Sequence, residues 1–144
     1  MRAGSFQPVE VEKAVESMAV MRQAAYFRLT GGPSPIVFDR SYFFEIGRTV
    51  KWLNGSEMAL ISTLTQTSWI LEAADILKTV GILPLVLHAP ALRPLDTDGI
   101  VAVAERIGLV VTADEHRLLG RLRCGTAEVM SEHPPTLDAR VGIQ

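Results

Sequence analysis

The chain has 144 residues, a net charge of −2 at pH 7 and 48% hydrophobic residues, which suits one globular domain with a short appendage. No basic run or aromatic-interleaved patch accompanies this near-neutral charge, so nucleic acid is excluded as a partner. The apolar stretches are far shorter than the ~20 residues needed to cross a bilayer. No signal peptide is expected either, so a cytoplasmic location is the default. Cys124 is the single cysteine, which excludes an internal disulfide and a thiolate zinc cluster.

The first part of the chain predicts one helix, one strand and a linker. Pro8 suits a helix start, and residues 24–29 predict a short strand. The Gly/Pro-rich run over residues 31–35 predicts a linker. The expected helix has an apolar stripe and a charged face, formed respectively by Val11, Ala14, Val15, Met18 and Met21, and by Glu10, Glu12, Lys13 and Glu16.

Short apolar strands alternate with helices over the rest of the chain. Asp96 is a candidate N-cap, Leu95 and Ile100 are placed as a hydrophobic staple, and Gly108 is a fitting C-terminal stop. This alternation predicts an α/β fold, a mostly parallel sheet with helices on both faces. The strands are expected at 58–62, 83–87, 109–112 and 139–143, and the apolar stripes of the helices at 69–80 (Trp69, Ile70, Ala73, Ile76, Leu77, Val80), 96–107 and 119–130 (Leu119, Leu122, Thr126, Val129, Met130).

Ligands of open parallel sheets gather at the carboxyl ends of the strands, and three such ends carry polar residues. The first, Ser62–Ser68, is rich in hydroxyls. It could receive a phosphate on the following helix N-terminus, or its hydroxyls could simply cap that helix. Neither GxGxxG nor GxxxxGK[ST] occurs in the sequence, which argues against a dinucleotide or P-loop site.

The other two strand ends are read as structural. His88 is interpreted as a hydrogen-bonded structural histidine rather than a base or ligand. Asp114, Glu115 and His116 are not expected to bind one metal, because consecutive residues of an extended segment point to opposite faces. Cys124 is predicted to be an inert buried thiol on a helix face.

Five motifs, in order along nearly the whole chain, resemble the C-terminal end of transketolases. Residues 112–116 (Thr-Ala-Asp-Glu-His), then Gly120 and 127–129 (Ala-Glu-Val), resemble the family's Thr-x-Glu-Glu-His strand end, glycine-rich helix start and Ala-Glu-Val helix. Residues 92–96 (Leu-Arg-Pro-Leu-Asp) resemble its Lys-Pro-Leu-Asp, and 44–47 (Phe-Glu-Ile-Gly) its Phe-x-Ile-Gly-Lys. Residues 8–15 and 26–29 resemble the closing helix and strand of the pyrimidine-binding domain.

The resemblance implies three parts: an appendage from the pyrimidine-binding domain (1–32), a linker (33–47) and a transketolase C-terminal-like α/β domain (48–144). It also implies that the ligands of thiamine diphosphate and Mg²⁺ lie in other domains. This chain alone is therefore expected to hold no catalytic, cofactor-binding or metal residue, and the assembled enzyme would carry both groups. Candidate substrate-phosphate or interface residues are Arg28, Glu115, His116, Arg121 and Arg123.

The sequence departs from the family at two places. The family's Gly-Gly-x-Gly is here Gly120-Arg121-Leu122-Arg123, and Leu64 stands where the family has a glycine. Arg121 and Arg123 could form a basic patch for a carrier protein or an acidic partner helix, or could simply be solvated.

Three functions are consistent with these patterns. The leading hypothesis is the C-terminal subunit or fragment of a split transketolase-like enzyme for two-carbon ketol or acyl transfer. It would be inactive alone and would join catalytic chains carrying the diphosphate- and pyrimidine-binding domains, in a homo- or hetero-oligomer. The alternatives are a non-catalytic module docking an acyl carrier protein or a catalytic chain, and a small flavodoxin-like ligand binder using residues 62–68.

Overall fold

The computed structural model describes residues 2–5, 7–29, 35–117, 121–133 and 136–143, with the backbone alone at residues 2, 5, 116, 117, 121, 123 and 143. The elements, in chain order, are β1 (Arg2–Ser5), α1 (Pro8–Ala19), β2 (Tyr26–Leu29), β3 (Val50–Leu53), β4 (Met58–Ser62), α2 (Gln66–Thr79), β5 (Pro84–His88), β6 (Ala91–Arg93), α3 (Thr97–Ile107), β7 (Leu109–Arg117), α4 (Arg121–Ser131) and β8 (Leu137–Ile143).

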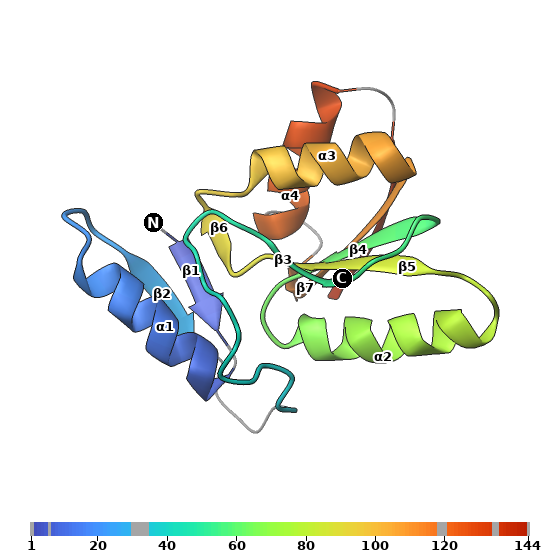
Figure 1. The fold of residues 1–144 in the computed structure, drawn as a ribbon. Coiled ribbons are helices and arrows are strands. Elements are labelled where there is room, and N and C mark those ends of the chain that lie inside the picture. Colours follow the sequence, from blue (N-terminus) through green and yellow to red (C-terminus); the bar gives the residue numbers. More distant parts are fainter. Residues whose placement is uncertain (1, 6, 30–34, 118–120, 134–135, 144) are drawn as a thin grey trace.

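The centre of the fold is a five-stranded sheet in the order β3-β5-β4-β7-β8. The four strands β5, β4, β7 and β8 run parallel, and β3 is antiparallel to β5. Helix α2 covers one face of this sheet, whereas α3 and α4 cover the other (Figure 1). The predicted α/β fold, with a mostly parallel sheet and helices on both faces, is confirmed.

Both faces of the central strands are buried, which explains why their sequences are continuously apolar rather than alternating. Along β4, Ile61 points into the core under α3 and α4, whereas Leu60 points into the core under α2. Val110 of β7 belongs to the first core and Ala113 to the second. The period of two along a strand therefore divides its residues between the two cores.

Both predicted ends of α3 are confirmed. The Asp96 side chain accepts a hydrogen bond from the Gly99 N–H (3.2 Å), and Gly108 ends the helix with φ of 71°. The Thr49 N–H and hydroxyl also donate to Asp96 Oδ2, at 2.8 and 2.7 Å. Burial opposes ionisation of Asp96, but the bonds from Thr49 and Gly99 and the nearby Arg48 outweigh it and lower the pKa of the carboxyl.

A second, three-stranded sheet has the order β2-β1-β6. Strand β1 is parallel to β2 and antiparallel to β6, which comes from the middle of the chain. Helix α1 begins at Pro8, as predicted, and lies beside this sheet (Figure 1). Its Ala14 packs against Phe38, Tyr42 and Phe44 in a third core.

Two predictions about buried faces are wrong. Glu10, assigned to the charged face of α1, is fully buried, whereas Val15 is half exposed. On α2, Ile70 and Ala74 are buried, but Trp69 and Ile76 of the predicted apolar stripe are exposed. The error on α1 has a physical cause, because the Glu10 carboxylate has a buried histidine partner that no local pattern reveals.

Helix α4 buries one stripe and exposes its cysteine. Leu122, Thr126 and Met130 are buried as predicted, whereas Leu119 lies outside the described residues. Cys124 is exposed, so the prediction of a buried thiol is wrong. Position 124 lies two residues from Leu122, on a different side of the helix from the buried stripe.

Candidate functional site

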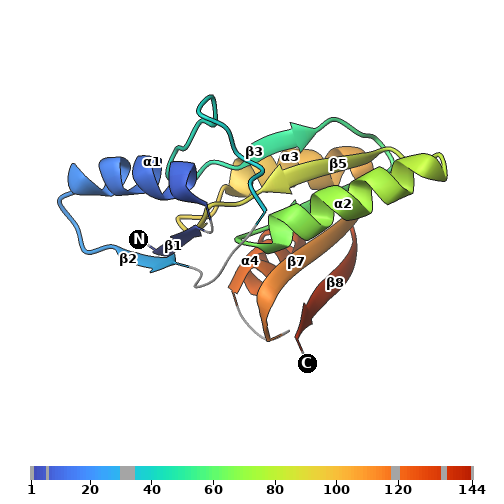
Figure 2. The same cartoon turned by 90° about the horizontal axis from the view of Figure 1, so that it is seen from below.

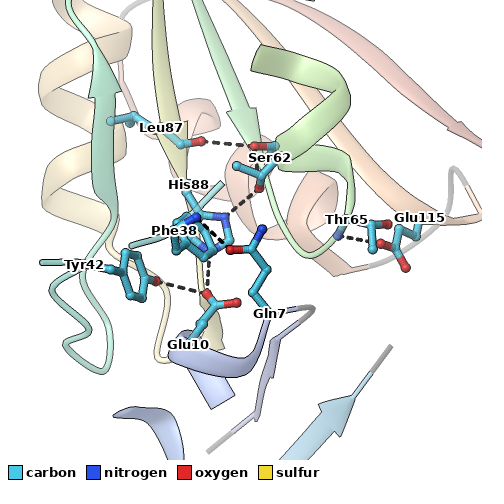
Figure 3. A network of polar contacts seen from close by, with 10 residues as sticks. Gln7, Glu10, Phe38, Tyr42, Ser62, Thr65, Leu87, His88 and Glu115 are labelled. Carbon is cyan, nitrogen blue, oxygen red and sulfur yellow. Dashed lines mark hydrogen bonds and ion pairs between the residues drawn. The ribbon is translucent and has the colours of Figure 1, made fainter. Parts of the chain in front are cut away.

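A buried polar network joins α1 to the carboxyl end of β5 (Figure 3). His88 Nε2 lies 2.6 Å from Glu10 Oε1, and His88 Nδ1 lies 2.7 Å from Thr67 Oγ1. The Tyr42 hydroxyl donates to the same Glu10 oxygen at 3.0 Å. Glu10, Thr67 and His88 are each completely buried. The interpretation of His88 as a hydrogen-bonded histidine is confirmed, and its partners come from separate elements.

One series of donors in this network, from Ser62 through Thr67 and His88, can lead to the Glu10 carboxylate. The Ser62 hydroxyl donates to Thr67 Oγ1 (3.0 Å), so the Thr67 hydroxyl is left to donate to His88 Nδ1. His88 Nε2–H then donates to Glu10. Burial, followed by the neighbouring charge of Glu10, raises the pKa of Tyr42 and keeps its hydroxyl a donor. A hydroxyl, a histidine and a carboxylate in this order resemble a nucleophile relay, but complete burial bars any substrate, so we assign the network a structural role.

The hydroxyl-rich residues after β4 turn inward. Thr63, Thr67 and Ser68 are buried along with Ser62, and the N-cap residue Thr65 makes no side-chain capping bond. The prediction that these hydroxyls simply cap α2 is therefore wrong. Their burial also gives the flavodoxin-like ligand binder no hydroxyl cradle on the surface. The cap comes from β7 instead.

Glu115 supplies that cap. Its Oε1 accepts a hydrogen bond from the Thr65 N–H at 2.6 Å (Figure 3). An anion is favoured there by the partial positive charge of the helix N-terminus. Asp114 instead accepts from the Leu122 N–H (3.4 Å) at the start of α4. Consecutive residues of β7 thus point to opposite faces, as predicted.

Arg28 lies within electrostatic reach of Glu115. Burial raises the pKa of Glu115, and the Thr65 N–H and the positive charge of Arg28 oppose this rise. Arg28 also lines a small hollow together with Tyr26, Thr63 and Leu64. The structure therefore brings together two of the predicted site residues, Arg28 and Glu115, near the carboxyl ends of β4 and β7.

Leu64 explains one departure from the family pattern. It has φ of 53°, the left-handed region that glycine enters most easily, and its side chain is buried. It also packs tightly on β1, because a Cβ added to Gly4 would lie 2.6 Å from Leu64 Cδ2. The family's glycine thus corresponds to a real backbone requirement, which this chain meets with a packed leucine.

The remaining predicted site residues are His116, Arg121 and Arg123. Their side chains lie outside the described part of the chain, so the basic patch stays a prediction. Among the described residues, no group of three His, Cys, Asp or Glu side chains could hold a metal ion. The described residues therefore do not fit a site for the Mg²⁺ that accompanies thiamine diphosphate.

The mostly parallel sheet, its helices on both faces and the polar carboxyl edge define an α/β domain. Residues 47–141 match the family model described as "Transketolase, C-terminal domain". The chain therefore belongs to the transketolase family. None of the helices in the described part of the chain is long and apolar enough to cross a membrane.

Several relatives support this assignment. A transketolase family protein of Sinorhizobium fredii is 38% identical over 115 residues, which are 78% of this chain and 33% of that protein. One subunit of an apulose-4-phosphate transketolase from Phocaeicola vulgatus is 26% identical over 126 residues, 87% of this chain and 40% of that protein. A solved split-gene transketolase, an inactive β4 tetramer, superposes with a TM-score of 0.95 at 31% identity, covering 99% of this chain and 48% of that chain.

The chain thus spans only 33% and 40% of the length of those two curated relatives. The similarity to the split-gene structure covers 99% of this chain, so it extends to residues before position 47.

Proposed function

We propose that this chain supplies the C-terminal part of a thiamine-diphosphate-dependent transketolase-like enzyme that transfers two-carbon ketol or acyl groups. Companion chains would carry the diphosphate- and pyrimidine-binding domains, and this chain alone would be inactive. The observation that carries the proposal is the match of residues 47–141 to the family's C-terminal domain. Two relatives support the proposal further, because one is named as a transketolase subunit and the other as a split-gene transketolase.

In this proposal, residues 1–32 complete a pyrimidine-binding domain and residues 48–144 form the C-terminal domain. Residues 33–47 link the two. In support, β2 is the outer strand of its sheet within the described residues. Tyr26 and Leu29 on β2, and Val20 just after α1, are exposed. An outer strand beside exposed apolar side chains favours a partner that continues the sheet.

Arg28 is our candidate for the substrate's phosphate. It lines the small hollow beside Thr63 and Leu64, near the carboxyl edge of the sheet, where ligands of such folds gather. A guanidinium binds phosphate through charge-assisted hydrogen bonds. Glu115 would act indirectly, by holding the Thr65 N–H and so fixing the start of α2 beside that hollow.

Reconstitution tests the proposal. The purified chain, mixed with companion chains carrying the two missing domains, should form a complex that transfers ketol groups. The chain alone should give no saturable heat with thiamine diphosphate and Mg²⁺ in calorimetry. Saturable micromolar binding by the isolated chain would contradict the division of labour. A complex that assembles without transfer activity would favour a docking module for a catalytic chain or an acyl carrier protein.

Arg28→Ala probes the phosphate contact within that complex. We expect KM for a phosphorylated acceptor to rise at least ~10-fold, the loss of one charged hydrogen bond, with KM for an unphosphorylated acceptor unchanged. Arg22→Ala, which removes an exposed arginine outside the helices and strands, is the matched control. Equal effects of Arg28→Ala on both acceptors would assign Arg28 to the interface instead.

A further inference from the structure

Strand β8 is the outer strand of the five-stranded sheet, and within the described residues no strand pairs with its free edge. It runs for seven residues, Leu137–Ile143. Figure 2 shows β8 at the rim of the sheet, beside β7 and beyond the reach of α2. A long exposed strand edge offers a row of backbone donors and acceptors to another strand.

The direction of those backbone groups can be assigned. The Leu137 N–H donates to the Gly108 carbonyl at 3.0 Å, on the side of β7. Backbone groups of successive residues in a strand alternate in direction. The groups of Leu137, Ala139 and Val141 therefore face β7, whereas those of Asp138 and Arg140 point outward to the free edge.

The side chains of β8 divide between the two faces of the sheet. The register pairs Ala139 with Val111, whose side chain packs in the core under α2, and Asp138 with Val110, which belongs to the core under α3 and α4. Leu137 and Val141 therefore lie on the α2 face. Helix α2 packs on β4, β5 and β7, and Leu137 and Val141 remain 73% and 54% exposed.

The opposite face of β8 carries an incomplete ion pair. Arg140 Nε donates to Asp138 Oδ2 at 2.6 Å. The other carboxylate oxygen, Asp138 Oδ1, is buried and has no hydrogen-bond partner in the described part of the chain. Asp138 and Arg140 border a surface hollow between α4 and β8. A buried carboxylate oxygen without a donor is costly, so a donor from outside would be stabilising there.

We propose that β8 of a second copy of this chain pairs antiparallel with β8, about a two-fold axis at Ala139. Because the outward-facing residues must lie opposite one another, only a few registers are possible. Centring the pair on Asp138 or on Arg140 sets like charges face to face, which is destabilising. Centring it on Ala139 sets Asp138 opposite Arg140 of the second copy, twice.

The same register also matches the apolar face. Leu137 lies opposite Val141 of the second copy, and the two-fold axis repeats this pair. The guanidinium of the second copy then offers a donor for the unpaired Asp138 Oδ1. The segment Leu137–Val141 is thus complementary to itself in backbone direction, charge and apolar surface, as an isologous two-fold interface requires. This interface does not depend on the proposed function.

Charge reversal tests the register. Asp138→Arg and Arg140→Asp each place like charges at both central pairs, so each variant alone should dimerise at least ~10-fold more weakly in sedimentation equilibrium. A mixture of the two variants restores both pairs and should recover a heterodimer, because the two arginines of one variant then face the two aspartates of the other. Lys51→Glu, on β3 at the opposite edge of the sheet, is the matched control and should leave the dimer intact.

A cross-link gives an independent readout that does not require altered charges. In a Cys124→Ser background, Ala139→Cys should form an intermolecular disulfide, because a residue on the axis faces its own copy at about 4.5 Å between Cα atoms. Val141→Cys faces Leu137 of the second copy and should not cross-link. A specific interface should have a dissociation constant below ~100 μM. A wild-type chain that stays monomeric at that concentration would overturn the proposal. So would a dimer unaffected by either charge reversal, or equal cross-linking at both positions.

Discussion

Replacing His88 by leucine should detach α1 from the rest of the fold. The substitution introduces an apolar side chain at the end of β5 and removes the Nε2–H that donates to Glu10 at 2.6 Å. It also removes the acceptor of the Thr67 hydroxyl at 2.7 Å. The Glu10 carboxylate is completely buried and cannot exchange the lost donor for water without opening α1.

The size of this effect follows from the burial of both partners. Removing the hydrogen-bond donor of a buried carboxylate costs about 3 kcal/mol, a large part of the roughly 5–15 kcal/mol that typically stabilises a domain. Urea unfolding followed by circular dichroism measures this loss as a lower midpoint. His133→Leu is the matched control. That histidine is exposed and lies 3.7 Å from Glu105, so the substitution should change stability by less than about 0.5 kcal/mol.

A second substitution identifies the cause. Glu10→Gln removes the buried charge that His88→Leu leaves behind, so the double variant should be more stable than the sum of the single effects predicts. We expect a coupling of about 1–3 kcal/mol. If His88→Leu lies within about 0.5 kcal/mol of the wild type, or if the two effects simply add, our account of the network is wrong.

Three further substitutions probe single features. Asp96→Ala removes the α3 cap and the Thr49 contacts and should lower the free energy of unfolding by about 2–4 kcal/mol at pH 7. The folded pKa of Asp96 is lowered, so urea unfolding should show this difference between wild type and variant above pH ~4 and lose it as pH falls further. Gly108→Ala meets no steric clash but has φ of 71°, so thermal unfolding should report a loss of about 1–2 kcal/mol from backbone strain alone. Leu64→Gly relieves φ of 53° but deletes a buried side chain, and calorimetry should show a net loss of about 1–3 kcal/mol; a gain would mean that strain outweighs packing.

The central sheet and its helices could be predicted from the sequence because their signals are local. Continuous apolar runs predicted the parallel strands, and β4 was predicted with its observed bounds, Met58–Ser62. Asp96 and Gly108 marked the ends of α3, because capping and left-handed stops depend on residues within one helical turn. The family's glycine at the position of Leu64 agrees with the left-handed backbone conformation found there, which was not itself predicted.

The three strands that sequence reasoning missed are short and lack such signals. β1, β3 and β6 hold only three or four residues each, too few for an alternating pattern. β1 and β6 are strands because they pair with each other across most of the length of the chain, Ala3 with Ala91. That pairing is a tertiary fact, and no window of sequence contains it.

Sequence reasoning identified some residues of the candidate site and missed others, for a similar reason. Arg28 and Glu115 were named from the family resemblance, and the structure brings them close together. Glu10 was assigned to solvent because a glutamate on an amphipathic helix is ordinarily exposed. Its partner His88 was noted, but their bond joins residues 78 positions apart. The one available signal was the presence of two ionisable residues, Glu10 and His88, in two different predicted elements.

That separation has a consequence for how the chain is synthesised. Glu10 leaves the ribosome 78 residues before its partner His88, an interval of about 4–16 s at roughly 5–20 residues per second. Strand β6 emerges later still, so β1 also waits for one of its two neighbours. Throughout this time the first helix exposes its future contact face in the nascent chain. Strand β1 and helix α1 are made before β5 and β6, and their packing is completed only after both of those strands have emerged.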